Sequence, residues 1–310
     1  MKEIIRILTV ATVSLCLFAS CNSAEQKNGG WSAFPYPSVP GVLTAPQEIQ
    51  EYIFAHFWDS YFKDPEKVDS LELEQAVSNY VSLLLPRPID KACSGITSLL
   101  EKAEGYQKEN AGSDVFGRVG ALVTKFLYDP NSPLRDEDIY RPFVQKLAES
   151  PFTEDAMRDA LREDARKCSL NRRGTAAFDL TFTDASGKNH NLYGVDAANT
   201  VLVFSNPGCG ACKEIVGSIQ EIPGIEERIE MHDLAVVNVY IDEDLDLWEE
   251  YRKEYPSYWI TGYDGKLILK KDTIYNIRAV PSVYLLDSGK NVILKDAPIE
   301  RVTDYLQKAR

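Results

Sequence analysis

The chain has 310 residues, of which 44% are hydrophobic and 26% are charged, a balance typical of globular proteins. This length is enough for two ordinary domains. The formal net charge is −13, which argues against nucleic acid as a partner, because binding phosphates requires clustered Lys and Arg. The acidity itself is typical of a soluble surface and predicts no particular function.

The first twenty residues have the pattern of an export signal. A positively charged start precedes a nearly uncharged apolar run over 7–18, which is too short for a stable membrane-spanning helix. Two small residues then come directly before Cys21, and this arrangement resembles the processing site of bacterial lipoproteins. The resemblance implies that residues 1–20 are removed and that Cys21 carries two acyl chains, which give stable anchoring. An ordinary secretory signal with a chance cysteine is the alternative.

Residues 21–46 are predicted to be a tether followed by an extended segment. A polar stretch ends in two consecutive glycines, as flexible linkers do. The following segment cannot be helical because it contains Pro35, Pro37, Pro40 and Pro46. We expect its aromatic residues to pack on the domain that follows.

Residues 47–171 are predicted to form a small all-α domain. Apolar residues recur at i, i+3, i+4 and i+7 over 89–103 and again over 115–127. Asp69 with Glu72 three residues later predicts a capping box at another helix start.

Two cysteines lie on the apolar stripes of this domain. Cys168 is in step with Met157 and Leu161, and Cys93 follows the stripe of its own helix, so we expect both to be buried. A structural disulfide between them is one prediction, because exported proteins keep disulfides. Two packed free thiols are the other, because free Cys is among the most buried residue types.

The periodicity of the sequence changes to two at residue 177, which marks a second domain over 172–310. The expected order is β, β, β, α, β, α, β, β, α, an α/β plan with helices on both faces of a sheet. The strands are predicted at 177–182, 191–195, 200–205, 234–241, 282–286 and 292–294.

Cys209 and Cys212 follow a buried strand and open a helix. A zinc site needs four ligands, and the chain has no second Cys-x-x-Cys and no histidine nearby in sequence, so the pattern favours a redox pair. Unpaired N–H groups and the helix dipole stabilise a thiolate on Cys209, the attacking sulfur. Cys212 lies one turn further on and can attack a mixed disulfide formed on Cys209. The turn around them consists of Pro207, Gly208, Gly210 and Ala211.

A second element lies about 70 residues later, where Val280 and Pro281 precede an apolar strand. A buried strand, a Cys-x-x-Cys at a helix start and a Val-Pro before a hairpin together resemble the thioredoxin superfamily. The extra hairpin over 177–195 resembles the exported TlpA and ResA type. The resemblance covers 173–310. It implies that Cys209 is the nucleophile, Cys212 the resolving cysteine and Pro281 a cis-proline, that the backbone of Val280 pairs with an extended substrate, and that no cofactor is needed.

The helical half resembles the N-terminal domain of Bacteroidetes lipoproteins that carry such a thioredoxin domain. The stretches that carry this resemblance are 128–134 and 171–176. No activity is implied by it.

Three positions depart from the superfamily pattern. Gly208 stands where most members have Trp, Val203 where thioredoxin has a buried Asp, and Ile215 where the ResA type has Glu. We therefore expect no acid–base helper beside the pair, and the sequence leaves the direction of electron flow open.

The leading hypothesis is a membrane-anchored periplasmic thiol–disulfide oxidoreductase that reduces disulfides of exported proteins and receives electrons from a membrane thiol carrier. A disulfide oxidase or isomerase is the close alternative. A binding or assembly lipoprotein, whose helical domain recognises a partner, is an alternative of a different kind. Peroxide reduction is disfavoured, because Asn206 occupies the position where peroxidases of this superfamily have Thr.

Overall fold

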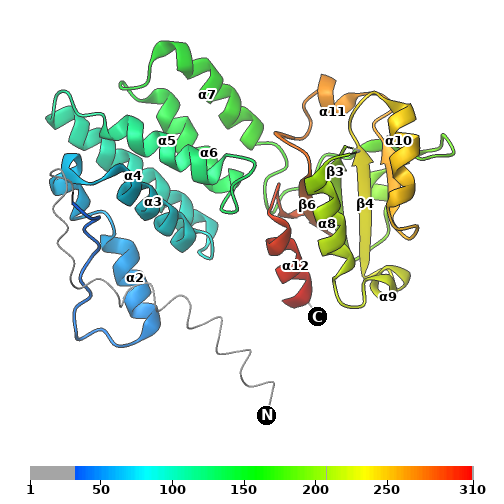
Figure 1. The fold of residues 1–310 in the computed structure, drawn as a ribbon, viewed down its shortest axis with the longest axis horizontal. Helices are drawn as coiled ribbons and strands as arrows, with labels where there is room; N and C mark the ends of the chain where they lie inside the picture. The colour runs from blue at the N-terminus through cyan, green and yellow to red at the C-terminus, as the bar shows by residue number, and fades with distance from the viewer. Residues whose placement is uncertain (1–31, 207, 309–310) are drawn as a thin grey trace.

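The computed structural model describes residues 32–206 and 208–308. An all-helical domain is followed by an α/β domain, and the two lie side by side along the long axis of the molecule (Figure 1). This arrangement confirms the predicted fold class. The predicted signal segment, the lipidation site Cys21 and Pro207 of the predicted turn lie outside the described residues.

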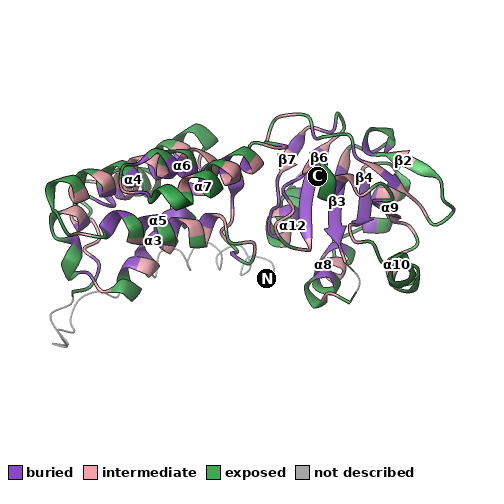
Figure 2. Cartoon of the chain, turned by 90° about the horizontal axis from the view of Figure 1, so that it is seen from above, coloured by how far each residue is buried: buried purple, intermediate pink, exposed green. Residues whose placement is uncertain are grey.

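The helical domain is built on five long helices and one shorter one at its start. Helix α6 packs against α4 and α7, while α5 packs against α3 and α4. Buried residues gather on the facing sides of these helices (Figure 2). In the part of the chain that the structure describes, no helix has the length and apolarity needed to cross a membrane. The bounds are α2 Pro46–His56, α3 Ser70–Leu84, α4 Ile89–Glu109, α5 Val115–Leu127, α6 Glu137–Glu149 and α7 Asp155–Cys168.

The proline-rich segment is held on this domain by Phe34. Its ring is 4% exposed and packs on three aromatic rings of the domain. Asp69 caps α3 as predicted, since its carboxylate accepts the Leu71 N–H at 2.8 Å. The predicted capping box is wrong at Glu72, whose carboxylate accepts the Phe34 N–H at 3.3 Å. Glu72 therefore ties the extended segment to the helices.

Both cysteines of the helical domain are free thiols, the second of the two predicted arrangements. Cys168 is fully buried. Cys93 is half-buried where burial was expected, and it donates to the carbonyl oxygen of Asp138 at 3.5 Å. Burial raises the pKa of both thiols.

The α/β domain contains a seven-stranded sheet in the order β2-β1-β5-β4-β3-β6-β7. The central strand β3 runs parallel to β4 and antiparallel to β6. Strands are β1 Thr181–Thr183, β2 Asn189–Asn191, β3 Asn199–Ser205, β4 Leu234–Tyr240, β5 Ile260–Tyr263, β6 Ser282–Asp287 and β7 Val292–Leu294. Helices are α8 Gly210–Gln220, α9 Ile225–Glu230, α10 Leu245–Tyr251, α11 Ile268–Lys271 and α12 Ile299–Lys308.

Alternating side chains of the central strands face two separate apolar clusters. One cluster joins Val201 and Val203 to α8, α9 and α12, and the other joins Leu202 and Phe204 to α11 and the segment before β3. The sequence prediction missed β5. It was also wrong at 192–194, which form a short 3-10 helix where a strand was expected.

Buried charges join the two domains. The Glu137 carboxylate, 1% exposed at the start of α6, lies 2.9 Å from Arg278 Nε and 2.8 Å from Lys295 Nζ. It also accepts from Asn276 Nδ2 at 2.8 Å. Asp136 beside it pairs with Arg173 and Arg301 of the α/β domain. The helical domain thus holds the loop over 272–281, which connects α11 to β6.

Candidate active site

Cys209 is the N-cap of α8, at the end of the turn that leaves the central strand β3. Its side chain is partly exposed, and its sulfur accepts the N–H of Cys212 at 3.4 Å. Other N–H groups of the first turn of α8 also lack helical acceptors, so this end of the helix favours a negative charge on the sulfur.

Cys212 lies one turn into α8 and is 4% exposed. Burial, together with the adjoining Cys209 thiol, raises the pKa of the Cys212 thiol to about 12. Cys212 therefore stays protonated near neutral pH, whereas Cys209 is the sulfur that solvent and a substrate can reach. The two cysteines have the separate surroundings that an attacking and a resolving sulfur require.

The backbone conformation at Gly208 explains why glycine stands where most of the superfamily has Trp. Its φ of +72° lies in the left-handed region, where glycine carries no steric penalty. A Cβ built at this position would lie 3.7 Å from the hydroxyl of Tyr251, an ordinary contact distance. The backbone conformation, more than a lack of room for a side chain, therefore favours glycine here. The other turn residues that the structure describes, Gly210 and Ala211, belong to the first turn of α8.

The positions expected to lack an acid are apolar and buried in the structure. Val203 and Ile215 are 2% and 8% exposed, while Glu214 faces solvent. A space of about 240 Å³ lies beside the cysteine pair. Among the described residues that line it, Glu254 is the only carboxylate, and it pairs with Lys213 at 3.3 Å. No carboxylate in this group is buried next to Cys212.

A polar group near Cys212 was missed by the sequence reasoning. Tyr255 lines the same space as Cys212, and its hydroxyl lies 3.1 Å from Ser205 Oγ. Ser205 in turn donates to Asn238 Oδ1 at 2.7 Å. These residues come from β3, β4 and the segment after α10, so no local motif connects them. The only sequence signal was their position at the carboxyl ends of two buried strands, the usual place for a site in an α/β sheet.

The loop before β6 forms the other wall of the site. The peptide bond between Val280 and Pro281 is cis, the isomer that the resemblance implies. The Val280 carbonyl oxygen lies 3.8 Å from Cys209 Sγ, which donates to it. Within the described residues nothing pairs with the Val280 N–H. An extended chain laid beside this loop therefore finds a free backbone donor next to the exposed sulfur.

The described residues contain no group of three or more His, Cys, Asp or Glu side chains arranged to hold a metal ion. The fold and the site together define a thioredoxin fold with two cysteines three residues apart, at a helix start that faces a cis-proline loop.

Comparison with solved structures identifies the family. The chain is 34% identical to a thioredoxin-like protein from Bacteroides caccae ATCC 43185. The match covers 90% of this chain and 99% of that one, and the two structures superpose with a TM-score of 0.80. The chain belongs to this family of thioredoxin-like proteins. Residues 18–170 match the family model of a domain of unknown function, DUF5106.

Two further structures are similar to part of the chain. The C-terminal domain of an uncharacterized protein from Bacteroides fragilis NCTC 9343 is 40% identical, over 44% of this chain and 98% of that one, with a TM-score of 0.43. The thioredoxin domain of a thiol-disulfide oxidoreductase from Bacteroides vulgatus is 19% identical, over 44% of this chain and 97% of that one, with a TM-score of 0.40. A search of curated proteins finds no match.

Proposed function

We propose that this chain is an exported, membrane-anchored thiol–disulfide oxidoreductase that reduces disulfides in other exported proteins. The observation that carries the proposal is the placement of Cys209, which caps α8, is partly exposed and faces Val280 at 3.8 Å, with Cys212 buried one turn behind it. A structural domain has no need of an accessible sulfur at this position.

The reaction follows from these surroundings. The Cys209 thiolate attacks one sulfur of a client disulfide, so that a Cys209–client bond forms and the other client sulfur leaves as a thiolate that takes a proton. Cys212 then attacks Cys209 Sγ and gives up its proton, which the leaving client sulfur takes up. The Cys209–client bond breaks, the second client thiol is released, and the Cys209–Cys212 disulfide remains. Two electrons have passed to the client, and a dithiol electron donor at the membrane restores the pair.

The anchoring and the location belong to the same proposal. Diacylation of Cys21 would place both domains on the periplasmic face of a bacterial membrane, where client disulfides persist. Metabolic labelling with a radioactive fatty acid should mark the wild type and leave Cys21→Ala unmarked, because the acyl chains are attached at this cysteine. An unmarked wild type would contradict the lipid anchor and leave the redox chemistry unaffected.

The reduction potential of the Cys209–Cys212 couple tests the redox reaction. It can be measured by counting alkylated cysteines after equilibration in graded thiol buffers, in a Cys93→Ala, Cys168→Ala background that isolates the pair. A value near about −270 mV supports a reductase, while a value towards about −120 mV identifies an oxidant or isomerase. If the two sulfurs form no disulfide in any buffer, the enzyme proposal fails.

A further inference from the structure

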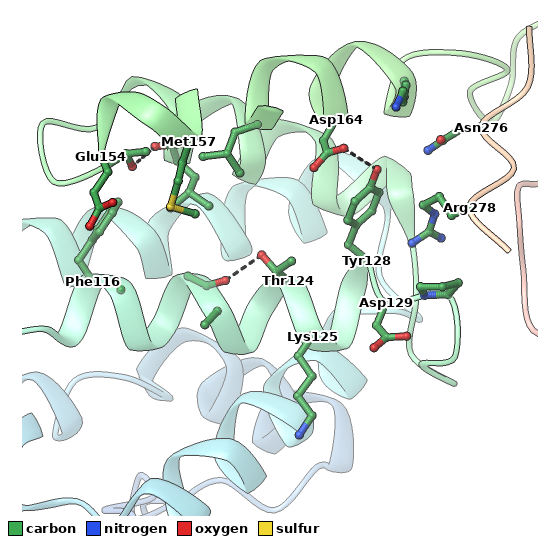
Figure 3. A pocket seen from close by; sticks show the side chains of 18 of the residues that line it. Phe116, Thr124, Lys125, Tyr128, Asp129, Glu154, Met157, Asp164, Asn276 and Arg278 are labelled. Atoms are coloured by element: carbon green, nitrogen blue, oxygen red, sulfur yellow. Dashed lines mark hydrogen bonds between the residues drawn. The ribbon is translucent and has the colours of Figure 1, made fainter. Parts of the chain in front are cut away.

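A second cavity lies away from the cysteine pair, between α5 and α7 of the helical domain (Figure 3). Its volume is about 960 Å³, at the upper end of the range of roughly 300–1,000 Å³ usual for ligand sites. Leu147 of α6 also lines it, and residues 276–278 of the α/β domain close one end. The cavity therefore lies where the helical domain meets the loop that continues into Val280 and Pro281.

The space exists because the middle of the α5 face that lines it carries small side chains. Gly117, Gly120, Ala121 and Thr124 follow i, i+3, i+4, i+7 spacing and all line the cavity. A Cβ placed on Gly117 would meet no atom within 4 Å. Met157 of α7, expected in the apolar stripe of its helix, is instead 52% exposed and lies at the same cavity.

Arg278 supplies an independent sign of a ligand. Its side chain is only 9% exposed, its Nε lies 2.9 Å from Glu137 and its Nη2 lies 2.5 Å from Asp296. Its third nitrogen, Nη1, is buried and has no hydrogen-bond partner among the described residues. The guanidinium points toward the Tyr128 ring on the cavity wall, 4.4 Å away (Figure 3). A buried donor without an acceptor is costly. Because Nη1 is closed off from the cavity in this structure, a ligand carbonyl oxygen would satisfy it only after the Arg278 side chain shifts toward the cavity.

The lining indicates the chemistry of that ligand. Phe116, Phe152, Met157 and Leu161 make most of the wall apolar, while charged groups of both signs surround it. Such a lining favours apolar side chains with backbone carbonyls over a strongly charged ligand. Met adapts its shape to different partners, as a site for varied sequences requires.

The position of the cavity connects it to the redox site. Arg278 is two residues before Val280, whose carbonyl faces Cys209. An extended chain advances about 3.3–3.6 Å per residue, so three or four residues of a client suffice to reach from Val280 to the cavity. We propose that the cavity between α5 and α7 binds an apolar segment of the client polypeptide whose disulfide is presented to Cys209. This inference rests on the proposed function and assigns substrate recognition to the helical domain.

The test compares two matched glycine variants. Gly117→Phe fills the cavity, whereas Gly105→Phe places the same side chain on an exposed position of α4 that is likewise free of neighbours within 4 Å. The probe is a fluorescent apolar peptide of about eight residues, without cysteine, long enough to fill the cavity. Its affinity is measured by fluorescence anisotropy. A second assay measures how fast the pre-reduced protein cleaves a disulfide-linked peptide with and without this apolar arm.

We expect the wild type and Gly105→Phe to bind the peptide, and Gly117→Phe to bind about tenfold more weakly, the effect of losing one buried apolar side chain. The arm should speed cleavage by a similar factor, except in Gly117→Phe. Equal binding by all three proteins, or binding by none, overturns the cavity proposal. So does a dimer in the absence of peptide that only Gly117→Phe disrupts, because a second copy would then be the occupant. If the wild type fails to cleave even the armless disulfide, the proposed function fails instead.

Discussion

The loop over 272–281 has contrasting surroundings at its two ends. At Val280 it faces the partly exposed sulfur of Cys209, held by a single long contact of 3.8 Å. At Asn276 and Arg278 it is bound to Glu137 of the helical domain by short contacts between side chains that are at most 9% exposed. The active end, at Val280, is accessible and makes few contacts. The junction end, at Asn276 and Arg278, is buried and surrounded by charged groups.

This difference shows how the fold separates reactivity from positioning. A group that reacts with an external substrate must remain accessible, so it cannot be held by many partners. A group that fixes one domain on another can be fully buried if its charge is paired and hydrogen-bonded, and it then strongly resists removal of a partner. Each prediction below acts on the redox site, on the domain junction or on the helical interior, and leaves the other regions unchanged.

Replacing Cys209 by Ser should have the largest effect. The substitution removes the attacking thiolate and leaves every contact of the junction in place, so disulfide exchange should be abolished while the unfolding midpoint in urea stays nearly unchanged. The Cys93→Ala, Cys168→Ala double variant is the control and should keep its activity. Residual exchange in Cys209→Ser would assign the attack to another sulfur.

Alkylation should separate the thiols by their surroundings. Because the pKa of Cys212 is raised to about 12, only about one molecule in ten thousand carries its thiolate at pH 8. A raised thiol pKa means that the reactive form is gained as the pH rises, so labelling of Cys212 should increase about tenfold per pH unit between pH 7 and 9. Mass spectrometry of briefly labelled native protein should find Cys209 modified first. Equal labelling of both sulfurs would contradict the buried, protonated state of Cys212.

Removing Glu137 tests the junction end. Glu137→Ala leaves Arg278 and Lys295 as buried charges without their common partner, which should cost about 3–5 kcal/mol of unfolding free energy in urea titrations. Exchange with a small disulfide should persist, since Cys209 caps α8 and Cys212 lies in its first turn, away from the junction. Glu101→Ala is the matched control, because its pair with Lys146 is at the surface and should cost about 1 kcal/mol or less. If the two variants lose the same stability, the buried charges do not hold the domains together.

The parts of this molecule that local patterns encode could be predicted from the sequence. The change from a helical to a strand period located the second domain, and the position of Cys209 at the start of a helix followed from the buried strand before it. The short strand β5 was missed because its four residues, Ile260–Tyr263, carry no clear alternation between flanking aromatic residues. Its strand conformation comes from pairing with β4 and β1, which is a tertiary effect.

The features that depend on contact between distant segments could not be predicted. Ser205, Asn238 and Tyr255 meet only when the sheet is assembled, and Glu137 meets Arg278 across 141 positions of the chain. Charged residues at the start of a helix such as α6 are ordinarily capping groups, so their burial in a domain junction had no local signal. The exposure of Met157 had no local signal either, because its stripe faces the small residues of α5 across an open cavity.

The smallest effect is expected for Cys168→Ala in the helical interior. Its thiol is fully buried, takes part in no disulfide and fills space as a small apolar group, so the loss of one heavy atom should cost about 1 kcal/mol of unfolding free energy. The backbone carbonyl that accepts from Lys295 is unaffected by the substitution, and the junction should therefore survive. Exchange should continue at the wild-type rate. A large loss of exchange would mean that a sulfur of the helical domain takes part in electron transfer, and the separation between a reactive end and a positioning end of the molecule would then be wrong.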